Sequence, residues 1–252
     1  MRRWGGYCKK RRSLLSFLSS LKVKIFADGA TLADMTALYR EPIIRGFTTN
    51  PTLMRQAGID DYEDFARQVL AAIPDRPISF EVFSDDFLEM EQQALKIATW
   101  GPNVYVKIPV TNTRGEAATL LIGRLAKRGI KLNVTAIMTL EQVNEILPAL
   151  IDCPAAYVSI FAGRIADTGR DPVPLMRAAA GIVSRQSHIE LIWASPREVL
   201  NVVQADEVGC HVITATNDIL KKLPLLGKDL TEYSLETVKM FRGDAVMAGF
   251  AI

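Results

Sequence analysis

The chain has 252 residues, of which 49% are hydrophobic and 23% are charged, and these proportions are typical of a soluble globular protein. No apolar run reaches the roughly 20 residues needed to span a bilayer, so we expect no membrane association and a cytoplasmic location. Two histidines and three widely separated cysteines indicate neither a disulfide framework nor a His/Cys metal centre. We therefore expect reduced thiols, no metal and no cofactor.

The formal net charge of +2 hides an asymmetry along the chain. Residues 1–12 contain six basic side chains and no acid, which leaves a net charge of −4 on the rest of the protein. A mildly acidic body argues against a nucleic-acid-binding surface. We expect residues 1–22 to form a disordered basic extension. A targeting or surface-binding segment is the alternative, because a short, largely apolar stretch over residues 14–18 follows the basic start.

From residue 23 onward, short β-rich apolar runs alternate with segments of helical periodicity. The predicted strands are 23–28, 43–47, 77–83, 103–108, 130–135, 156–161, 189–194 and 210–214. The predicted helices between them include 61–72, 86–99, 115–128, 139–147, 174–185 and 197–204. Asp61 and Asp85 are expected as helix N-caps, and Pro174 is expected in a first helical turn.

Eight strand–helix units predict an α/β protein built as a single (β/α)₈ (TIM) barrel over residues 23–230. A doubly wound sheet is the alternative, but no Gly-rich phosphate fingerprint follows any strand. Residues 231–252 are expected to form a helical tail, broken near Gly243, with a packing or subunit-contact role. We expect a homo-oligomer.

Polar side chains lie where the predicted strands end, and barrel enzymes place their chemistry at these ends. Asp28, Glu81 and Lys107 all belong to apolar strands. The other strand ends supply Thr49, Asn50, Asn133, Thr135, Ser159, Arg164, Ser195 and Arg197. An ammonium at Lys107 would lose hydration, which would lower the pKa of the amine. The neutral amine is the nucleophile that forms a Schiff base with a ketone.

Each of these residues also has a structural interpretation. Lys107 could be paired with Glu81 or Asp28 without any chemistry, and Thr48, Thr49 and Pro51 could simply form a turn. Asn133 and Thr135 could be satisfied core polar residues. Arg164 could pair with Asp167 or Asp171, Arg197 could be an exposed first-turn residue, and Phe161 could be core.

Eight sequence blocks then resemble the transaldolase family, including its small fructose-6-phosphate aldolase-like members. They are FADGA (26–30), GFTTNPTLM (46–54), SFEVF (79–83), YVKIPVT (105–111), LNVTAIMT (132–139), SIFAGRIADTG (159–169), WASPRE (193–198) and GCHVITAT (209–216). They occur in family order and cover residues 23 to about 220.

The resemblance implies ping-pong transfer of a dihydroxyacetone unit between a ketose phosphate, such as sedoheptulose 7-phosphate or fructose 6-phosphate, and an aldose phosphate. Lys107 matches the Schiff-base lysine, and Asp28 matches the acid/base for C–C cleavage. Glu81 with Thr135 matches the pair that activates the water of imine formation and hydrolysis. The residues implied to bind substrate or its phosphate are Thr49, Asn50, Asn133, Ser159, Phe161, Arg164, Ser195 and Arg197.

Two enzyme activities share this resemblance. Glu81, Phe161 and Arg197 match transaldolases, whereas the aldolase-like members carry Gln and Tyr at the first two positions and lack the Arg. We therefore expect a transaldolase; the alternatives are an aldolase that releases dihydroxyacetone and, more remotely, a non-catalytic sugar-phosphate-binding barrel. Arg114 and Pro196 depart from the family pattern and are expected to affect the acceptor or phosphate side.

Overall fold

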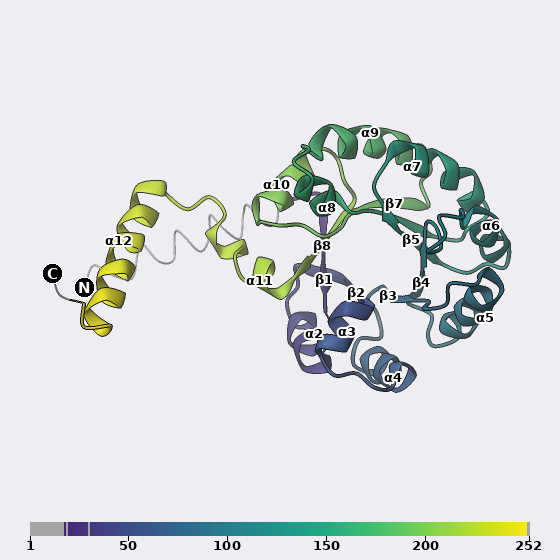
Figure 1. The fold of residues 1–252 in the computed structure, drawn as a ribbon, viewed down its shortest axis with the longest axis horizontal. Coiled ribbons are helices and arrows are strands. Elements are labelled where there is room, and N and C mark those ends of the chain that lie inside the picture. Colours follow the sequence, from purple (N-terminus) through teal and green to yellow (C-terminus); the bar gives the residue numbers. More distant parts are fainter. Residues whose placement is uncertain (1–17, 19, 30, 251–252) are drawn as a thin grey trace.

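Eight parallel strands form a closed barrel in the order β1 to β8, and a ring of helices surrounds it (Figure 1). The computed structural model describes residues 18, 20–29 and 31–250. The strands are β1 (Lys24–Asp28), β2 (Ile44–Thr48), β3 (Ile78–Glu81), β4 (Val104–Pro109), β5 (Leu132–Ile137), β6 (Ala156–Ile160), β7 (Ile189–Trp193) and β8 (Val212–Thr216). The predicted (β/α)₈ barrel is confirmed.

The helices follow the strands in alternation. They are α2 (Leu32–Tyr39), α3 (Pro51–Gln56), α4 (Tyr62–Ala72), α5 (Phe87–Ala98), α6 (Thr119–Lys127), α7 (Leu140–Ile146), α8 (Ala162–Asp167), α9 (Val173–Val183), α10 (Leu200–Glu207), α11 (Asn217–Leu220) and α12 (Leu230–Met247), with 3₁₀ turns η1 (Leu147–Leu150) and η2 (Leu223–Leu225). Asp61 caps α4 as predicted, and Pro174 lies in the first turn of α9. The prediction for Asp85 was wrong: Asp86 caps α5 by accepting from two backbone amides of that helix.

Aromatic side chains fill the barrel interior towards the amino ends of the strands. Phe26 packs edge-on against Tyr157, with ring centroids 5.6 Å apart, and the ring of Tyr105 is tilted against that of Tyr157, with centroids 4.4 Å apart. Gly46 is paired with Phe26 across the β1–β2 ladder, and a Cβ at Gly46 would lie 2.5 Å from the Phe26 ring. The phenyl ring therefore occupies the space of the missing side chain. In β1, β4 and β6 these aromatic residues lie nearer the amino ends of the strands than Asp28, Lys107 and Ser159 do. The aromatic layer therefore fills the barrel interior beneath these polar residues.

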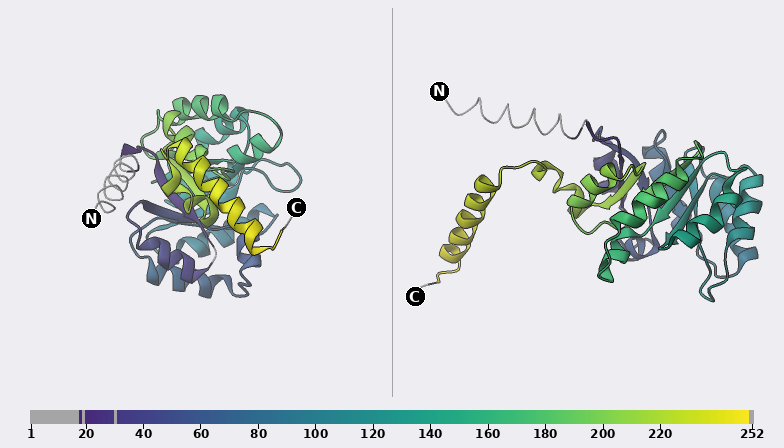
Figure 2. Two further views of the ribbon diagram at one scale, coloured as in Figure 1. Left: turned by 90° about the vertical axis from the view of Figure 1, so that its left-hand side faces the viewer. Right: turned by 90° about the horizontal axis from the view of Figure 1, so that it is seen from above.

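Helix α12 projects away from the barrel (Figures 1 and 2). The helix lies wholly within the described residues, and none of its residues is buried. It runs unbroken through Gly243, so the predicted break was wrong. One glycine costs a helix about 1 kcal/mol relative to alanine, and the strong helix formers around it outweigh that cost.

At the other end of the described chain, most of the predicted extension 1–22 lies outside the described residues. Leu18 and Leu21 pack against the barrel core. The backbone amides of Lys22 and Val23 both donate to Asp206 of α10, at 2.6 and 2.8 Å. The described end of the extension is thus attached to the barrel.

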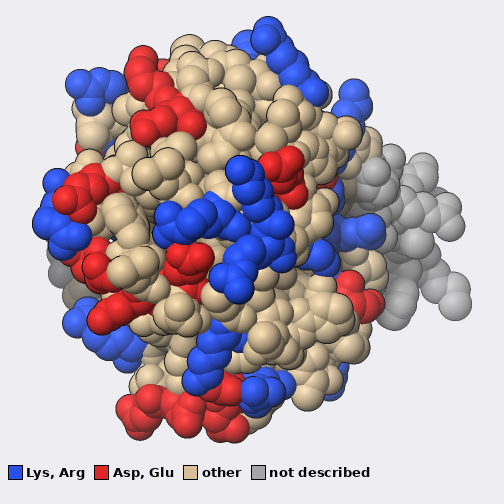
Figure 3. All heavy atoms as spheres, turned by 90° about the vertical axis from the view of Figure 1, so that its right-hand side faces the viewer, with Lys and Arg blue, Asp and Glu red and all other residues tan. Residues whose placement is uncertain are grey.

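The outer face over α5 and α6 carries basic and acidic side chains side by side (Figure 3). Glu91 of α5 pairs with Arg124 at 2.8 Å and with Arg128 at 3.7 Å. This face therefore has mixed charge. No helix within the described residues combines the length and the apolar character that crossing a membrane requires.

Candidate active site

A cavity of about 530 Å³ opens at the carboxyl ends of the strands. Its walls include eleven of the twelve predicted site residues: Asp28, Asn50, Glu81, Lys107, Asn133, Thr135, Ser159, Phe161, Arg164, Ser195 and Arg197. The twelfth, Thr49, is fully buried beside the cavity. Its hydroxyl donates to the carbonyl oxygen of Ser79 at 2.9 Å. Thr49 therefore contributes its backbone carbonyl oxygen to the site, where it accepts from Lys107, and not its side chain.

Lys107 lies in the cavity wall on β4, between the fully buried Val106 and Ile108, and only 6% of its surface is exposed. Its Nζ donates to the carbonyl oxygen of Thr49 at 2.9 Å and to Glu81 Oε2 at 3.1 Å. Glu81 is the direct neighbour of Lys107 in the β3–β4 ladder. The ion pair with Glu81 is thus present, and it lies inside a cavity large enough for a small molecule.

Asp28 ends β1 with both carboxylate oxygens occupied. Oδ1 accepts from the Thr48 hydroxyl at 3.0 Å, and Oδ2 accepts from Asn50 Nδ2 at 3.1 Å. Burial raises the pKa of Asp28 above its ordinary value, while Lys107 and the two hydrogen bonds act in the opposite direction. Asn50 also caps α3 by accepting from the Leu53 amide at 2.9 Å. Because this cap holds its amide in place, Asn50 fixes the orientation of Asp28.

A second polar chain crosses the cavity floor. The Ser159 hydroxyl donates to Asn133 Oδ1 at 2.7 Å, and Asn133 Nδ2 donates to the Ser79 hydroxyl at 3.0 Å. All three residues are buried. By contrast, the buried Thr135 hydroxyl has no hydrogen-bond partner among the described residues. A buried hydroxyl without a partner is costly, so Thr135 is suited to hold a water or a substrate group in the cavity.

The two predicted phosphate-binding arginines differ in their partners. Arg197 makes a two-point ion pair with Asp167 of α8, with Nε at 3.0 Å from Oδ1 and Nη2 in contact with Oδ2. Arg164 makes no ion pair with any carboxylate of the described residues, and its guanidinium lies 5.8 Å from the centre of the Phe161 ring. The Asp167 pairing considered for Arg164 thus belongs to Arg197. Arg197 also precedes α10 instead of lying in its first turn.

The loop that carries Arg197 lies against α8. Ser195 adopts a positive φ of 59°, and a Cβ at Gly163 would lie 1.5 Å from the Ser195 carbonyl oxygen. Only glycine permits this approach of two backbones. The contact brings Arg164, Ser195 and Arg197 to one side of the cavity.

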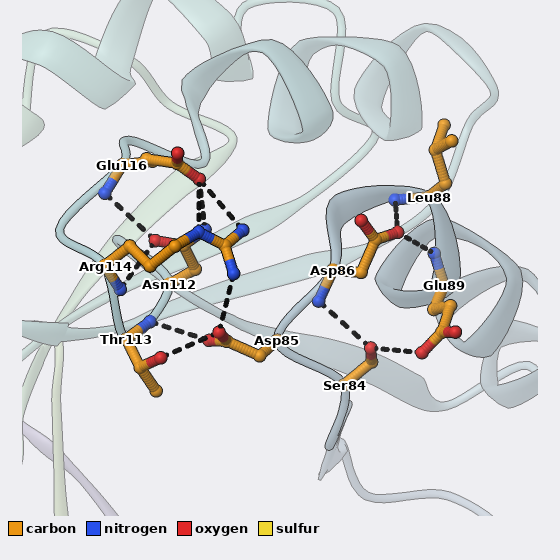
Figure 4. A network of polar contacts seen from close by, with 9 residues as sticks. All are labelled: Ser84, Asp85, Asp86, Leu88, Glu89, Asn112, Thr113, Arg114 and Glu116. Atoms are coloured by element: carbon orange, nitrogen blue, oxygen red, sulfur yellow. Dashed lines mark hydrogen bonds and ion pairs between the residues drawn. The ribbon is translucent and has the colours of Figure 1, made fainter.

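Ionic contacts join the loops after β3 and β4 (Figure 4). Asp85 accepts from the backbone amide and the hydroxyl of Thr113, both at 2.7 Å, and from Arg114 Nη1 at 3.1 Å. Arg114 also pairs with Glu116 at 3.0 Å. These bonds lower the pKa of Asp85, chiefly through the Thr113 amide. Arg114 is committed to this loop junction and is absent from the cavity wall, whereas Pro196 lines it.

Sequence reasoning missed three contributors to the site. Thr48 was interpreted as a turn former, yet it bonds to Asp28, and Thr214 of β8 contacts Thr48. Tyr62, on the outside of the barrel, bonds to the backbone of Glu81. The alternation of β8 could have indicated that Thr214 points inward, but no local signal identifies its partner.

Residues 25–251 match the family described as Transaldolase/Fructose-6-phosphate aldolase. A "Probable transaldolase" of Dehalococcoides mccartyi is 34% identical over 202 residues, covering 80% of this chain and 90% of that protein. Another "Probable transaldolase", from Streptococcus equi subsp. zooepidemicus, is 35% identical over 225 residues, covering 88% and 97%.

Among solved structures, a putative phosphonomutase from Burkholderia cenocepacia has a TM-score of 0.56 at 10% identity, covering 92% of this chain and 98% of that one. A 2,3-dimethylmalate lyase has a TM-score of 0.53 at 12% identity, covering 96% and 89%. At these identities the likeness extends to the fold alone. The family match and the relatives establish that the chain belongs to the transaldolase/fructose-6-phosphate aldolase family.

Proposed function

We propose that this protein is a transaldolase, which transfers a dihydroxyacetone unit from a ketose phosphate to an aldose phosphate through a Schiff base on Lys107. The observation that carries the proposal is the burial of Lys107 in the cavity with Glu81 at 3.1 Å. Glu81 can accept the proton that the ammonium must lose before it attacks a ketone.

The remaining steps use the other cavity residues. Attack on the substrate carbonyl and loss of water give the imine, and Glu81 with the Thr135 hydroxyl would hold that water. Asp28 would take the proton of the C4 hydroxyl, so that the C3–C4 bond breaks and the first aldehyde leaves. The electron pair stays on the bound three-carbon unit as an enamine, which attacks the acceptor aldehyde while Asp28 returns the proton.

Phosphate binding is assigned to the side of the cavity that holds Arg164, Ser195 and Arg197. A guanidinium binds a phosphate through paired charge-assisted hydrogen bonds. Arg164 has no ion pair with a described carboxylate, and so it is available to an incoming anion. These residues support a preference for phosphorylated sugars.

The test combines trapping with a transfer assay. Borohydride reduction in the presence of fructose 6-phosphate should add mass at Lys107 alone, as seen by peptide mapping, and Lys107→Met should abolish the adduct. Erythrose 4-phosphate should strongly raise glyceraldehyde 3-phosphate production from fructose 6-phosphate. An adduct on another lysine would overturn the assignment. A production rate that no aldose phosphate changes would establish the aldolase activity instead.

A further inference from the structure

Two threonine hydroxyls form a hydrogen-bonded chain that ends on Asp28. Thr48 on β2 is 4% exposed and Thr214 on β8 is 6% exposed. Thr48 Oγ1 lies 3.0 Å from Asp28 Oδ1 and 2.5 Å from Thr214 Oγ1. Strands β2 and β8 flank β1, so the chain passes across the inside of the strand that carries Asp28.

The direction of the hydrogen bonds follows from proton counting. A hydroxyl has one proton to donate, whereas an ionised carboxylate can only accept. While Asp28 is ionised, Thr48 gives its proton to Asp28 and must accept the bond that links it to Thr214. Thr214 is then the donor, and each bond polarises the next one.

We propose that Thr48 and Thr214 act as a hydroxyl chain that orients Asp28 and stabilises its ionised form, which makes both threonines positioning residues for the proton transfer. The inference rests on the proposed function, in which Asp28 is the acid/base. When Asp28 receives a proton, its carboxyl group can donate to Thr48, and Thr48 can then turn its own proton towards Thr214. The chain therefore accommodates both states, but the bonds to the charged state are the stronger ones.

The groups around Asp28 shift its pKa in both directions, and the hydroxyl chain acts in the same direction as Lys107. Burial and the nearby Glu81 of β3 raise the pKa of Asp28, while Lys107 of β4 lowers it. Asp218 of α11, Arg164 and Arg197 line the same cavity. Since Thr48 also lowers the pKa of Asp28, removing either hydroxyl should shift the acid/base towards its protonated form.

The experiment replaces each hydroxyl by a methyl group of similar size, in Thr48→Val and Thr214→Val, and records kcat/KM for transfer against pH. The acid limb of this profile reports the free enzyme's essential base, and it should move to higher pH in both variants. On that limb, loss of about one hydrogen bond should lower kcat/KM by roughly three- to tenfold for Thr48→Val, and by less for Thr214→Val. The plateau above the limb should change little.

Controls separate this inference from the proposed function and from a packing role. Thr214→Ser should keep the wild-type profile, because it keeps the hydroxyl, and Thr214→Ala serves if the valine variant does not fold. Thr119→Val, on the outer helix α6, is the matched control and should leave the profile unchanged. A uniform fall at every pH, or an unmoved acid limb, would overturn the inference. If the wild-type protein forms no Lys107 adduct and transfers nothing, the proposed function fails first.

Discussion

Tyr62 holds Glu81 by both of its backbone polar groups. The Tyr62 hydroxyl accepts from the Glu81 amide at 2.7 Å and donates to the Glu81 carbonyl oxygen at 3.1 Å. Tyr62 lies on α4, and its ring packs against Phe80, Phe83 and Trp100. Burial raises the pKa of Tyr62, so the hydroxyl stays protonated and able to donate. The carboxylate beside Lys107 is thereby positioned from outside the barrel.

Tyr62→Phe should remove this support and leave the ring contacts in place. Two buried backbone groups would lose a partner, so the free energy of unfolding should fall by about 1–3 kcal/mol. The rate of Lys107 adduct formation should also fall, because Glu81 would be less well oriented. Denaturant unfolding and time-resolved borohydride trapping measure the two effects. Tyr39→Phe, which removes an exposed bond to Asp75, is the control and should leave trapping unchanged.

Arg164→Gln and Arg197→Gln should each weaken phosphorylated substrates by about 1.5–3 kcal/mol, the usual range for hydrogen bonds to charged groups. Unphosphorylated dihydroxyacetone should be affected less. The measurement compares kcat/KM for the two substrate types. Arg170→Gln is the control. Within the described residues, the side chain of Arg170 forms a hydrogen bond to Thr168 alone. Equal losses for both substrate types would mean that the arginines act structurally.

Phe161→Tyr should increase the release of free dihydroxyacetone relative to transfer. Phe161 lines the cavity that contains Asp28, and a hydroxyl on its ring could organise a water that protonates the bound enamine. The ratio of free dihydroxyacetone to transfer product, at fixed acceptor concentration, reports the change. Phe161→Leu, which adds no hydroxyl, should not raise this ratio; an equal rise in both variants would point to cavity size instead.

Removing residues 230–252 should lower the oligomeric state. Several apolar side chains of α12 are well exposed, including Leu235 at 53%, Val238 at 59% and Phe241 at 63%. Exposed apolar surface of this kind favours association, and a second copy of the chain is the partner that is always available. Light scattering after size exclusion should give the full chain a mass larger than that of one subunit, and the truncated chain should contain fewer subunits. A full chain that is already monomeric would contradict the prediction.

The eight strands could be predicted because apolar runs and turn residues are local features, and Lys107, Asp28 and Glu81 stood out as charges within those runs. The partners of these residues were harder to predict. Tyr62 and Glu81 are 19 positions apart, and Thr48 and Thr214 are 166 apart. Alternation along a strand tells which side chains point inward, but the barrel's closure decides which of them meet. For the same reason the ion pair of Arg197 with Asp167 became visible only in the folded chain.

The contact between Gly163 and Ser195 has a consequence for how this site can change during evolution. A side chain at Gly163 would overlap a carbonyl oxygen, and that oxygen belongs to a residue already held at an unfavourable φ. Neither position can therefore accept most substitutions by itself. A selection that starts from Gly163→Ala should therefore recover second-site changes within residues 194–197. A larger residue at either of these two positions would then arise through paired changes rather than single steps.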